Sequence, residues 1–300
     1  MSSSGIVFWS MMDVKLGASK FYLENALGWF FQSKLQQVSR FPGPAGGFLS
    51  RTEAAFLLAS ALLISSALFI PPIAQDQSYH VFADQRPWGP LANAADTLSN
   101  LSFLLAGGWG LWQVACSQNF PSSPLIRSLA AIFLVGVMLT GLASMFYHLA
   151  PSDSRLAVDR FAMSLAFAAA LALLAADRVS ERLAVWLVTI LFVLAPLTVW
   201  IWVDSGNLTP YAVLQFGGVT LIALFSWWPS LRDPGFNFLG LLLFYGLAKL
   251  AEVLDGRIFE LTLGLVSGHT LKHLLAALGV IVLVLPIFSR SKALTQFVKR

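Results

Sequence analysis

Three of the chain's four histidines stand where they could bind one metal ion. His269 and His273 are four residues apart, which on a helix places both imidazoles on one face with Cβ atoms roughly 5–6 Å apart. His148 ends another long apolar run and can serve as a third ligand. Three protein ligands plus water are typical of a catalytic zinc rather than a structural one. The spacing therefore predicts a catalytic zinc site at His148, His269 and His273.

Two further polar residues accompany these histidines. Ser144 precedes His148 by four residues, so a helix would place the two on one face. Asp159 begins the next apolar run, and a nearby carboxylate is what a zinc-bound water needs for proton transfer. Each histidine taken singly fits a hydrogen-bonded packing role as well. The combined set favours a metal site.

The elements that carry these residues are apolar runs long enough to cross a membrane. The 300 residues are 57% hydrophobic and 11% charged, with a mean hydropathy of +0.73. A span of about 20 apolar residues crosses a hydrocarbon core about 30 Å thick. We expect spans at residues 54–71, 94–115, 127–149, 157–176, 182–203, 209–229, 236–254 and 266–288. The sequence thus predicts an all-α polytopic membrane helix bundle, in which one extra N-terminal transmembrane helix (54–72) precedes a seven-helix core (73–288).

The remaining segments are the two ends of the chain. Residues 1–53 form a cytoplasmic or interfacial segment, within which 21–41 fits either an amphipathic helix on the membrane surface or a weakly ordered tail. Residues 289–300 are expected to be a cytoplasmic tail. Both termini are placed in the cytoplasm because the lysines and arginines gather in the loops on their side. The opposite side holds Arg86, Arg155, Arg160 and Arg257.

This topology brings the chemistry-bearing residues together. His148 ends a span running outward, whereas Asp159, His269 and His273 begin spans running inward. All four therefore fall near the outer face at similar depth. That agreement is independent of the spacing and supports a shared site.

Composition also excludes several classes of protein. The formal charge of +4 is spread along the chain and indicates no nucleic-acid partner. The single cysteine, Cys116, excludes an intramolecular disulfide framework and a cysteine-rich metal site. The glycines do not form a phosphate-binding or dinucleotide-binding loop. The sequence gives no indication of oligomeric state.

Other polar residues fall inside or beside the spans. Asp96 either orients an imidazole as a second-layer partner of the site or serves as a helix cap. Ser99, Asn100 and Ser102 are expected to bond neighbouring helices.

Three ionisable residues lie near the ends of the last two predicted spans. Lys249 and Glu252 share a helix face and are expected to form a buried ion pair. Lys272 lies between the two paired histidines, and we expect it to point away from their face. It would then snorkel to the interface or pair with an acidic neighbour.

At these residues the sequence resembles the alkaline ceramidase family. That family belongs to a wider CREST-type superfamily of membrane hydrolases, which includes adiponectin-type receptors and GPI-remodelling lipases. Its signature is Ser-x3-His, an Asp after ten further residues, and a distant His-x3-His in the last helix. Here the signature is matched by Ser144, His148, Asp159, His269 and His273. The polar stretch 96–101 (DTLSNL) also resembles the opening of the family's first core helix, and the resemblance covers roughly residues 76–288.

The resemblance implies that the three histidines bind Zn²⁺ and that Asp159 shuttles the proton of the metal-bound water. It also implies that Ser144 helps to hold that water or the oxyanion. The implied reaction is hydrolysis of an amide in a ceramide-like membrane lipid to a sphingoid base and a fatty acid. Asp84-Gln85-Arg86-Pro87-Trp88 does not reproduce the acidic calcium-binding segment of the animal enzymes. Together with the extra span, this indicates a bacterial member in the inner membrane.

Three alternatives remain at this point. The superfamily's receptors suggest a non-catalytic lipid-binding protein that holds zinc structurally. A lipid esterase would carry the same residues. A retinal-type protein with a Schiff base at Lys249 would leave the histidines without a role.

Overall fold

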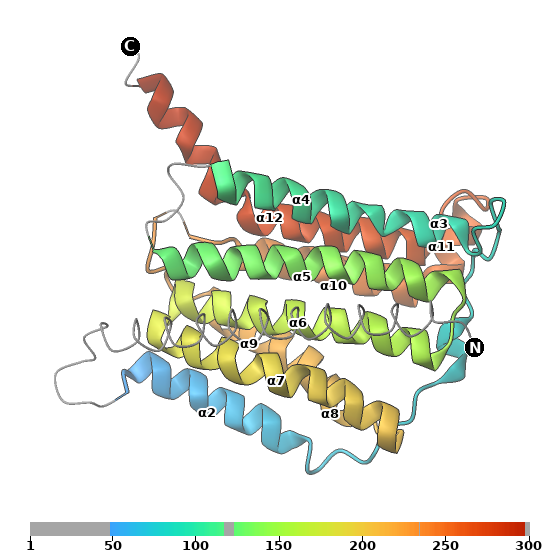
Figure 1. Cartoon of the computed structure of the whole chain (residues 1–300), viewed down its shortest axis with the longest axis horizontal. Helices are drawn as coiled ribbons and strands as arrows, with labels where there is room; N and C mark the ends of the chain where they lie inside the picture. The colour runs from blue at the N-terminus through green and yellow to red at the C-terminus, as the bar shows by residue number, and fades with distance from the viewer. Residues whose placement is uncertain (1–48, 117–122, 234, 298–300) are drawn as a thin grey trace, which may run out of the picture. The chain divides into compact units, whose positions relative to one another are not determined.

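The computed structural model describes residues 49–116, 123–233 and 235–297, and their regular elements are helices (Figure 1). Within these ranges there is no β-strand, and one isolated bridge joins Trp88 to Leu91. The prediction of an all-α bundle is confirmed. Most of the predicted N-terminal segment, residues 1–48, lies outside the described residues.

The described elements follow the predicted spans closely. In chain order they are α2 Arg51–Ser66, the 3-10 turn η1 Gln77–His80, α3 Ala94–Ser99, α4 Leu101–Cys116, α5 Pro124–Leu149, α6 Asp153–Arg178, α7 Glu181–Ser205, α8 Thr209–Ala212, the π-helical turn η2 Val213–Gly217, α9 Gly218–Ser226, α10 Phe238–Val253, α11 Asp255–Leu261 and α12 Gly268–Phe297. The short helix α11 lies between two predicted spans. Helix α12 continues through most of the predicted C-terminal tail.

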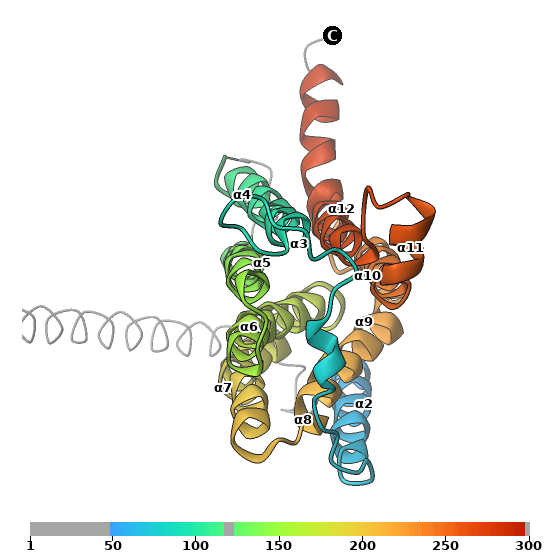
Figure 2. The ribbon, with the colours of Figure 1, turned by 90° about the vertical axis from the view of Figure 1, so that its right-hand side faces the viewer.

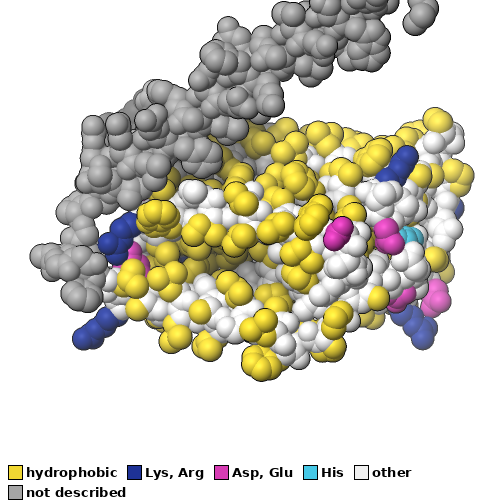
Figure 3. Space-filling view, turned by 60° about the horizontal axis from the view of Figure 1, so that its bottom comes forward, with side chains coloured by type: hydrophobic (Ala, Val, Ile, Leu, Met, Phe, Trp, Pro, Cys, Tyr) yellow, Lys and Arg dark blue, Asp and Glu magenta, His cyan; other side chains and the backbone are white. Residues whose placement is uncertain are grey.

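Five of the described helical segments are long and apolar enough to cross a membrane: α5, α6, α7, residues Thr209–Ser226 and residues Gly268–Phe288. Helices α2, α4 and α10 have 16 residues each and are shorter. Figure 3 shows hydrophobic side chains across the middle of one face, with charged groups toward both ends. Leu62, Val193 and Trp200 are 60–67% exposed. Such a surface is suited to hydrocarbon rather than water, and the chain is a membrane protein. The orientation of the termini stays a prediction.

Successive helices pack side by side, as the view onto one end of the bundle shows (Figure 2). Helix α5 packs between α4 and α6, and α6 also contacts α7 and α9. Helix α10 joins α9 to α12, and α12 returns to α4. This arrangement brings the beginning of α12 next to the end of α5, although more than 100 residues separate them in sequence.

Helix α6 supplies much of the interior of the bundle. Every residue from 168 to 176 is buried, and these residues are alanines and leucines. Small side chains allow neighbouring helices to approach from several sides at once. The first turns of α6, which carry Asp159 and Arg160, are thereby fixed relative to α5 and α7.

The extra helix α2 is anchored to the core by a buried carboxylate. Ser50 and Glu53 form a capping box at its start, and Glu53 also accepts hydrogen bonds from Arg182 and Ser180 at the start of α7. Burial of the Glu53 carboxyl opposes ionisation. The hydrogen bonds from Arg182, Ser180 and the Ser50 backbone outweigh that effect and lower the pKa of Glu53 to about 2. Phe56 then packs on Phe225 with ring centroids 4.8 Å apart.

Candidate metal centre

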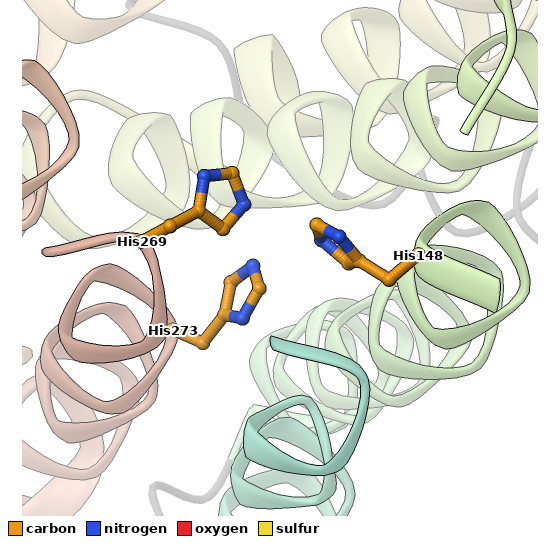
Figure 4. A group of neighbouring side chains, drawn as sticks. All are labelled: His148, His269 and His273. Atoms are coloured by element: carbon orange, nitrogen blue, oxygen red, sulfur yellow. The ribbon is translucent and has the colours of Figure 1, made fainter. Parts of the chain in front are cut away.

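The three predicted histidine ligands converge at one end of the bundle. His148 lies in the last turn of α5, and His269 and His273 lie in the first turns of α12. Their rings point toward one another in Figure 4, and the side chains are 1–4% exposed. One nitrogen from each ring lies within 4.8 Å of the others. The i, i+4 spacing and the antiparallel approach of two helices therefore place the imidazoles as predicted.

The geometry fits a metal ion with a small adjustment of the rings. Nitrogens bound to one tetrahedral zinc at about 2.0–2.1 Å lie about 3.3–3.4 Å apart, so nitrogens as far apart as 4.8 Å must approach each other by about 1.4 Å. Nδ1 of His148 is buried and has no hydrogen-bond partner among the described residues. A buried nitrogen without a partner is costly, and a metal would relieve that cost. The buried cluster could hold a metal ion.

A serine on α3 sets the orientation and the protonation of His273. Ser99 Oγ lies 2.7 Å from His273 Nδ1 and 2.9 Å from the backbone carbonyl oxygen of Asp96. The hydroxyl has one proton, and the carbonyl can only accept it. Ser99 Oγ therefore accepts the proton of His273 Nδ1–H. Nε2 of His273 is left with its lone pair, the state in which an imidazole binds a metal.

Aromatic packing holds the rings in place. The Phe82 ring lies 4.7 Å from that of His148 and 4.6 Å from that of His269, between centroids. On the backbone side, Asn93 Nδ2 donates to the carbonyl oxygen of His148 over 2.8 Å. Asn93 has a φ of 45°, a left-handed conformation that asparagine tolerates better than most residues. These contacts restrict the motion of His148 and His269.

Two carboxylates anchor the start of α12 and thus His269. Asp255 Oδ1 accepts a hydrogen bond from the backbone N–H of His269 over 2.7 Å. Asp96 Oδ1 accepts from the hydroxyls of Thr270 and Ser267 over 2.6 and 3.1 Å. Negative charge near a helix N-terminus also complements the helix dipole. The Asp96 carboxylate therefore holds the helix that carries the ligands, and Ser99 rather than this carboxylate contacts an imidazole.

Close backbone packing fixes the same helix start. A Cβ atom added at Gly268 would clash with the carbonyl oxygen of Ala251 and the backbone of Asp255. A side chain at this position would push α12 away from the end of α10. Glycine therefore lets the His269 backbone reach Asp255.

Lys272 lies closer to the histidines than the sequence predicted. Its Nζ is 2.8 Å from His269 Nε2, which contradicts the expectation that it points away from their face. Residues at i, i+3 are neighbours on a helix, and the long side chain bends back toward His269. The expected pairing with an acidic neighbour is confirmed, because Nζ lies 3.0 Å from Glu252 Oε1. A metal bound through His269 Nε2 would displace the ammonium from that atom.

Lys249 completes this ion cluster. Lys249 Nζ lies 2.7 Å from Glu252 Oε2, so the predicted i, i+3 pair is formed and Glu252 is shared between two lysines. Tyr79 donates a hydrogen bond to Glu252 Oε1 over 3.3 Å. Because Lys249 is held by Glu252, this cluster is a structural and electrostatic feature of the site's wall.

The two further sequence candidates lie together beside the histidines. Ser144, Asp159 and His273 line one cavity of about 130 Å³. Asp159 Oδ1 is buried and has no hydrogen-bond partner in the part of the chain that the structure describes. This carboxylate is thus available to a water molecule or a ligand in the cavity.

The cavity lined by Ser144, Asp159 and His273, called the polar cavity below, adjoins an apolar cavity. A neighbouring cavity of about 170 Å³ is lined almost wholly by apolar side chains of α5, α6, α9, α10 and α12. The two cavities share Phe103, Thr140, Met163 and Tyr245 on their walls. A molecule with a polar group and a hydrocarbon chain would match this change from polar to apolar lining.

The fourth histidine has a separate role. His80 lies on η1, and its ring nitrogens contact Tyr147 Oη over 2.9 Å and Asp153 Oδ1 over 3.1 Å. It ties the loop before α3 to the junction of α5 and α6. His80 is outside the three-histidine cluster.

Sequence reasoning missed several residues of this site. Ser99 bonds another helix as expected, because His273 lies on α12, but a residue type as common as serine did not indicate that its partner would be an imidazole. Asp255 and Phe82 contact the ligands from segments outside the signature. The contact of Lys272 with His269 was also missed, although the i, i+3 spacing of the two residues was an available signal for it. Comparison with protein-family models and with curated proteins found no match.

Proposed function

We propose that the protein is a zinc-dependent hydrolase that cleaves the amide bond of a ceramide-like lipid within the membrane. The observation that carries this proposal is the buried three-histidine cluster beside a cavity that Ser144, Asp159 and His273 line together. A metal held structurally needs no carboxylate facing a cavity. The partnerless Oδ1 atom of Asp159 therefore favours catalysis over a purely structural metal.

His148, His269 and His273 would hold the metal ion. Three neutral imidazoles and an open position are the ligand set of catalytic zinc. When bound, zinc supplies a Lewis acid and makes water a better nucleophile at neutral pH. Other divalent metals also accept imidazole ligands, so the identity of the metal is part of the proposal.

Asp159 would move the proton and Ser144 would hold the reacting group. Attack of water on the amide carbonyl forms a C–O bond and releases a proton, which Asp159 accepts. Asp159 then gives this proton to the nitrogen as the C–N bond breaks, so that a free amine and a carboxylic acid leave. The Ser144 hydroxyl can donate to the developing oxyanion, and one such donor is commonly worth about 3–4 kcal/mol.

The cavities support a lipid as the substrate. The amide would lie in the polar cavity next to His273, and one hydrocarbon chain would extend into the apolar cavity. Because the surrounding helices face hydrocarbon, the chain need not pass through water. We further propose that the protein lies in a bacterial inner membrane with both termini in the cytoplasm and the site near the outer face.

Lipid mass spectrometry tests the proposal. Purified, metal-analysed protein is incubated with a mixed sphingolipid and glycerolipid extract, and the products are measured beside those of His269→Ala. Release of sphingoid base and fatty acid by the wild type alone supports an amidase. Release of fatty acid from glycerolipids alone would replace the amidase with an esterase. Bound zinc without any product would instead indicate a non-catalytic lipid-binding protein.

The control variant for this experiment is His80→Ala. It removes a histidine at the same end of the bundle without touching the three ligands. We expect it to keep bound zinc and activity, whereas His269→Ala loses both. Full turnover by His269→Ala would contradict the assignment of the site.

A further inference from the structure

One buried cation in the wall of the polar cavity forms no ion pair with a carboxylate. Arg160 is 7% exposed and lines the same cavity as Asp159 and His273. Its Nη2 atom donates to Gln75 Oε1 over 2.6 Å, whereas Nη1 is buried without a hydrogen-bond partner among the described residues. Removing a guanidinium from water is costly unless its donors are satisfied. The mechanism proposed above gives this group no role.

Neighbouring carboxylates do not pair with Arg160. Within the described ranges, no carboxylate forms an ion pair with Arg160. Asp159, the preceding residue on the helix, lines the same cavity and interacts with Arg160 through space, but no hydrogen bond joins the two side chains. Glu252 is already shared between Lys249 and Lys272. The guanidinium therefore has a free donor and no carboxylate hydrogen-bonded to it.

Aromatic rings hold the guanidinium in place. Its Cζ atom lies 4.3 Å from the Trp202 ring centroid, 5.2 Å from that of Tyr211 and 5.9 Å from that of Tyr79. Cation–π contacts offset part of the cost of burial without using the N–H groups. A donor fixed in this way is preorganised for a planar or tetrahedral anion, which arginine binds through paired hydrogen bonds.

The charge of the cavity favours an anion as well. Its lining contains three cations, Arg160, Lys249 and Lys272, and two carboxylates, Asp159 and Glu252. The net charge of the lining is therefore +1 before any metal is bound. In a buried site with low dielectric, this excess attracts an anionic group more strongly than it would in water.

We propose that Arg160 binds an anionic group, a carboxylate or a phosphate, that the lipid substrate carries close to its scissile amide. This inference rests on the proposed function and narrows its substrate class from neutral ceramides to acidic lipid amides. Arg160 is then a specificity-determining residue, and the anion also positions the amide relative to His273 and Asp159.

A pair of probes that differ in charge tests the inference. N-palmitoylglycine and N-palmitoylethanolamine share the amide and the hydrocarbon chain, and the first carries a carboxylate where the second carries a hydroxyl. Their dissociation constants are measured by calorimetry in detergent, with full-length protein that a chelator has stripped of metal. Turnover and metal coordination then contribute nothing. We expect the wild type to bind the carboxylate probe at least about tenfold more tightly, which is the value of one good charge-assisted hydrogen bond. Equal binding of the two probes would overturn the inference.

Substitutions test whether Arg160 causes the preference for the carboxylate probe. Arg160→Gln is expected to abolish the preference by weakening the binding of the carboxylate probe alone. Arg160→Lys is expected to retain part of the preference. The matched control is Arg257→Gln, because Arg257 is an exposed arginine at the same end of the bundle and pairs with Glu260. Retention of the full preference by Arg160→Gln would overturn the role of this residue. If Arg160→Gln does not fold, the affinities of Arg160→Lys and of the wild type for the two probes still test the inference.

Further arms separate the related outcomes. N-palmitoyl-phosphoethanolamine carries a phosphate in place of the carboxylate. The acidic probe that binds more tightly shows whether the site takes a carboxylate or a phosphate. Turnover by metal-loaded protein is measured on all three probes. A binding preference without hydrolysis of any probe would refute the proposed function and leave the anion site standing. Hydrolysis of all three at equal kcat/KM would refute the anion site and leave the hydrolase standing.

Discussion

Ser99→Ala should weaken zinc binding although Ser99 is not a ligand. In the structure its oxygen accepts the proton of His273 Nδ1–H and its own proton goes to the Asp96 carbonyl oxygen. The His273 side chain is 3% exposed, so water does not readily replace the lost acceptor. Leaving a buried N–H unsatisfied costs about 1–3 kcal/mol. Loss of such partners typically lowers metal affinity about 10–100-fold, which agrees with that range.

The assay is a competition titration of zinc against a chromophoric chelator in detergent, at fixed pH. The matched control is Ser102→Ala, which removes a hydroxyl one turn further along the same segment. Ser102 donates to the carbonyl oxygen of Ser99 over 2.7 Å, and its contact with His273 is to the backbone carbonyl oxygen over 3.4 Å rather than to the imidazole. We expect it to keep wild-type affinity. Equal zinc affinity for Ser99→Ala and wild type would refute the reasoning about the tautomer of His273.

The remaining predictions concern the helix start, the extra helix and the proton acceptor. Gly268→Ala should lower the free energy of unfolding by about 1–3 kcal/mol through overpacking and reduce bound zinc, whereas Gly256→Ala, where an added Cβ meets no atom within 4 Å, should do neither in thermal melts and metal analysis. Because the pKa of Glu53 falls from 4.5 in the unfolded chain to about 2, its contribution to stability is complete above about pH 4.5 and is lost as the pH falls toward 2. Glu53→Gln should therefore flatten the stability profile in that window, and an unchanged profile would contradict the anchoring role. Asp159→Asn should lower kcat by at least about 100-fold while zinc content stays at one ion per chain, and wild-type turnover would exclude it as the proton acceptor.

Much of the fold follows from hydropathy and helix length. The predicted spans at 127–149, 182–203 and 236–254 correspond to α5, α7 and α10 within a few residues. Membrane helices satisfy their own backbone hydrogen bonds, so a long apolar run has few alternatives. The interruption within the span at 209–229 and the short helix between the last two spans could not be predicted in the same way. The π-helical turn at 213–217 and the short helix α11 depend on packing between neighbours, and no local residue pattern marks them.

The candidate site was likewise only partly predictable from the sequence. The spacing of His269 and His273 fixes one helix face, and the depth of His148 in the predicted topology brings it to the same end of the bundle. Neither rule indicates which serine contacts an imidazole or which carboxylate caps α12. Those contacts join residues more than 150 positions apart, as for Ser99 with His273, or involve Asp255 at the start of the short helix α11, which lies between two predicted spans. Lys272 shows a different limit, because the path of a long flexible side chain is set by its surroundings.

X-ray absorption spectroscopy of the purified protein, combined with metal analysis, tests the central claim most directly. We expect one zinc ion per chain with three imidazole nitrogens at about 2.0–2.1 Å and one oxygen ligand. His148→Ala should lose that spectrum while His80→Ala keeps it. Protein that holds no zinc above background after metal loading, or zinc that persists unchanged in His148→Ala, would contradict the account.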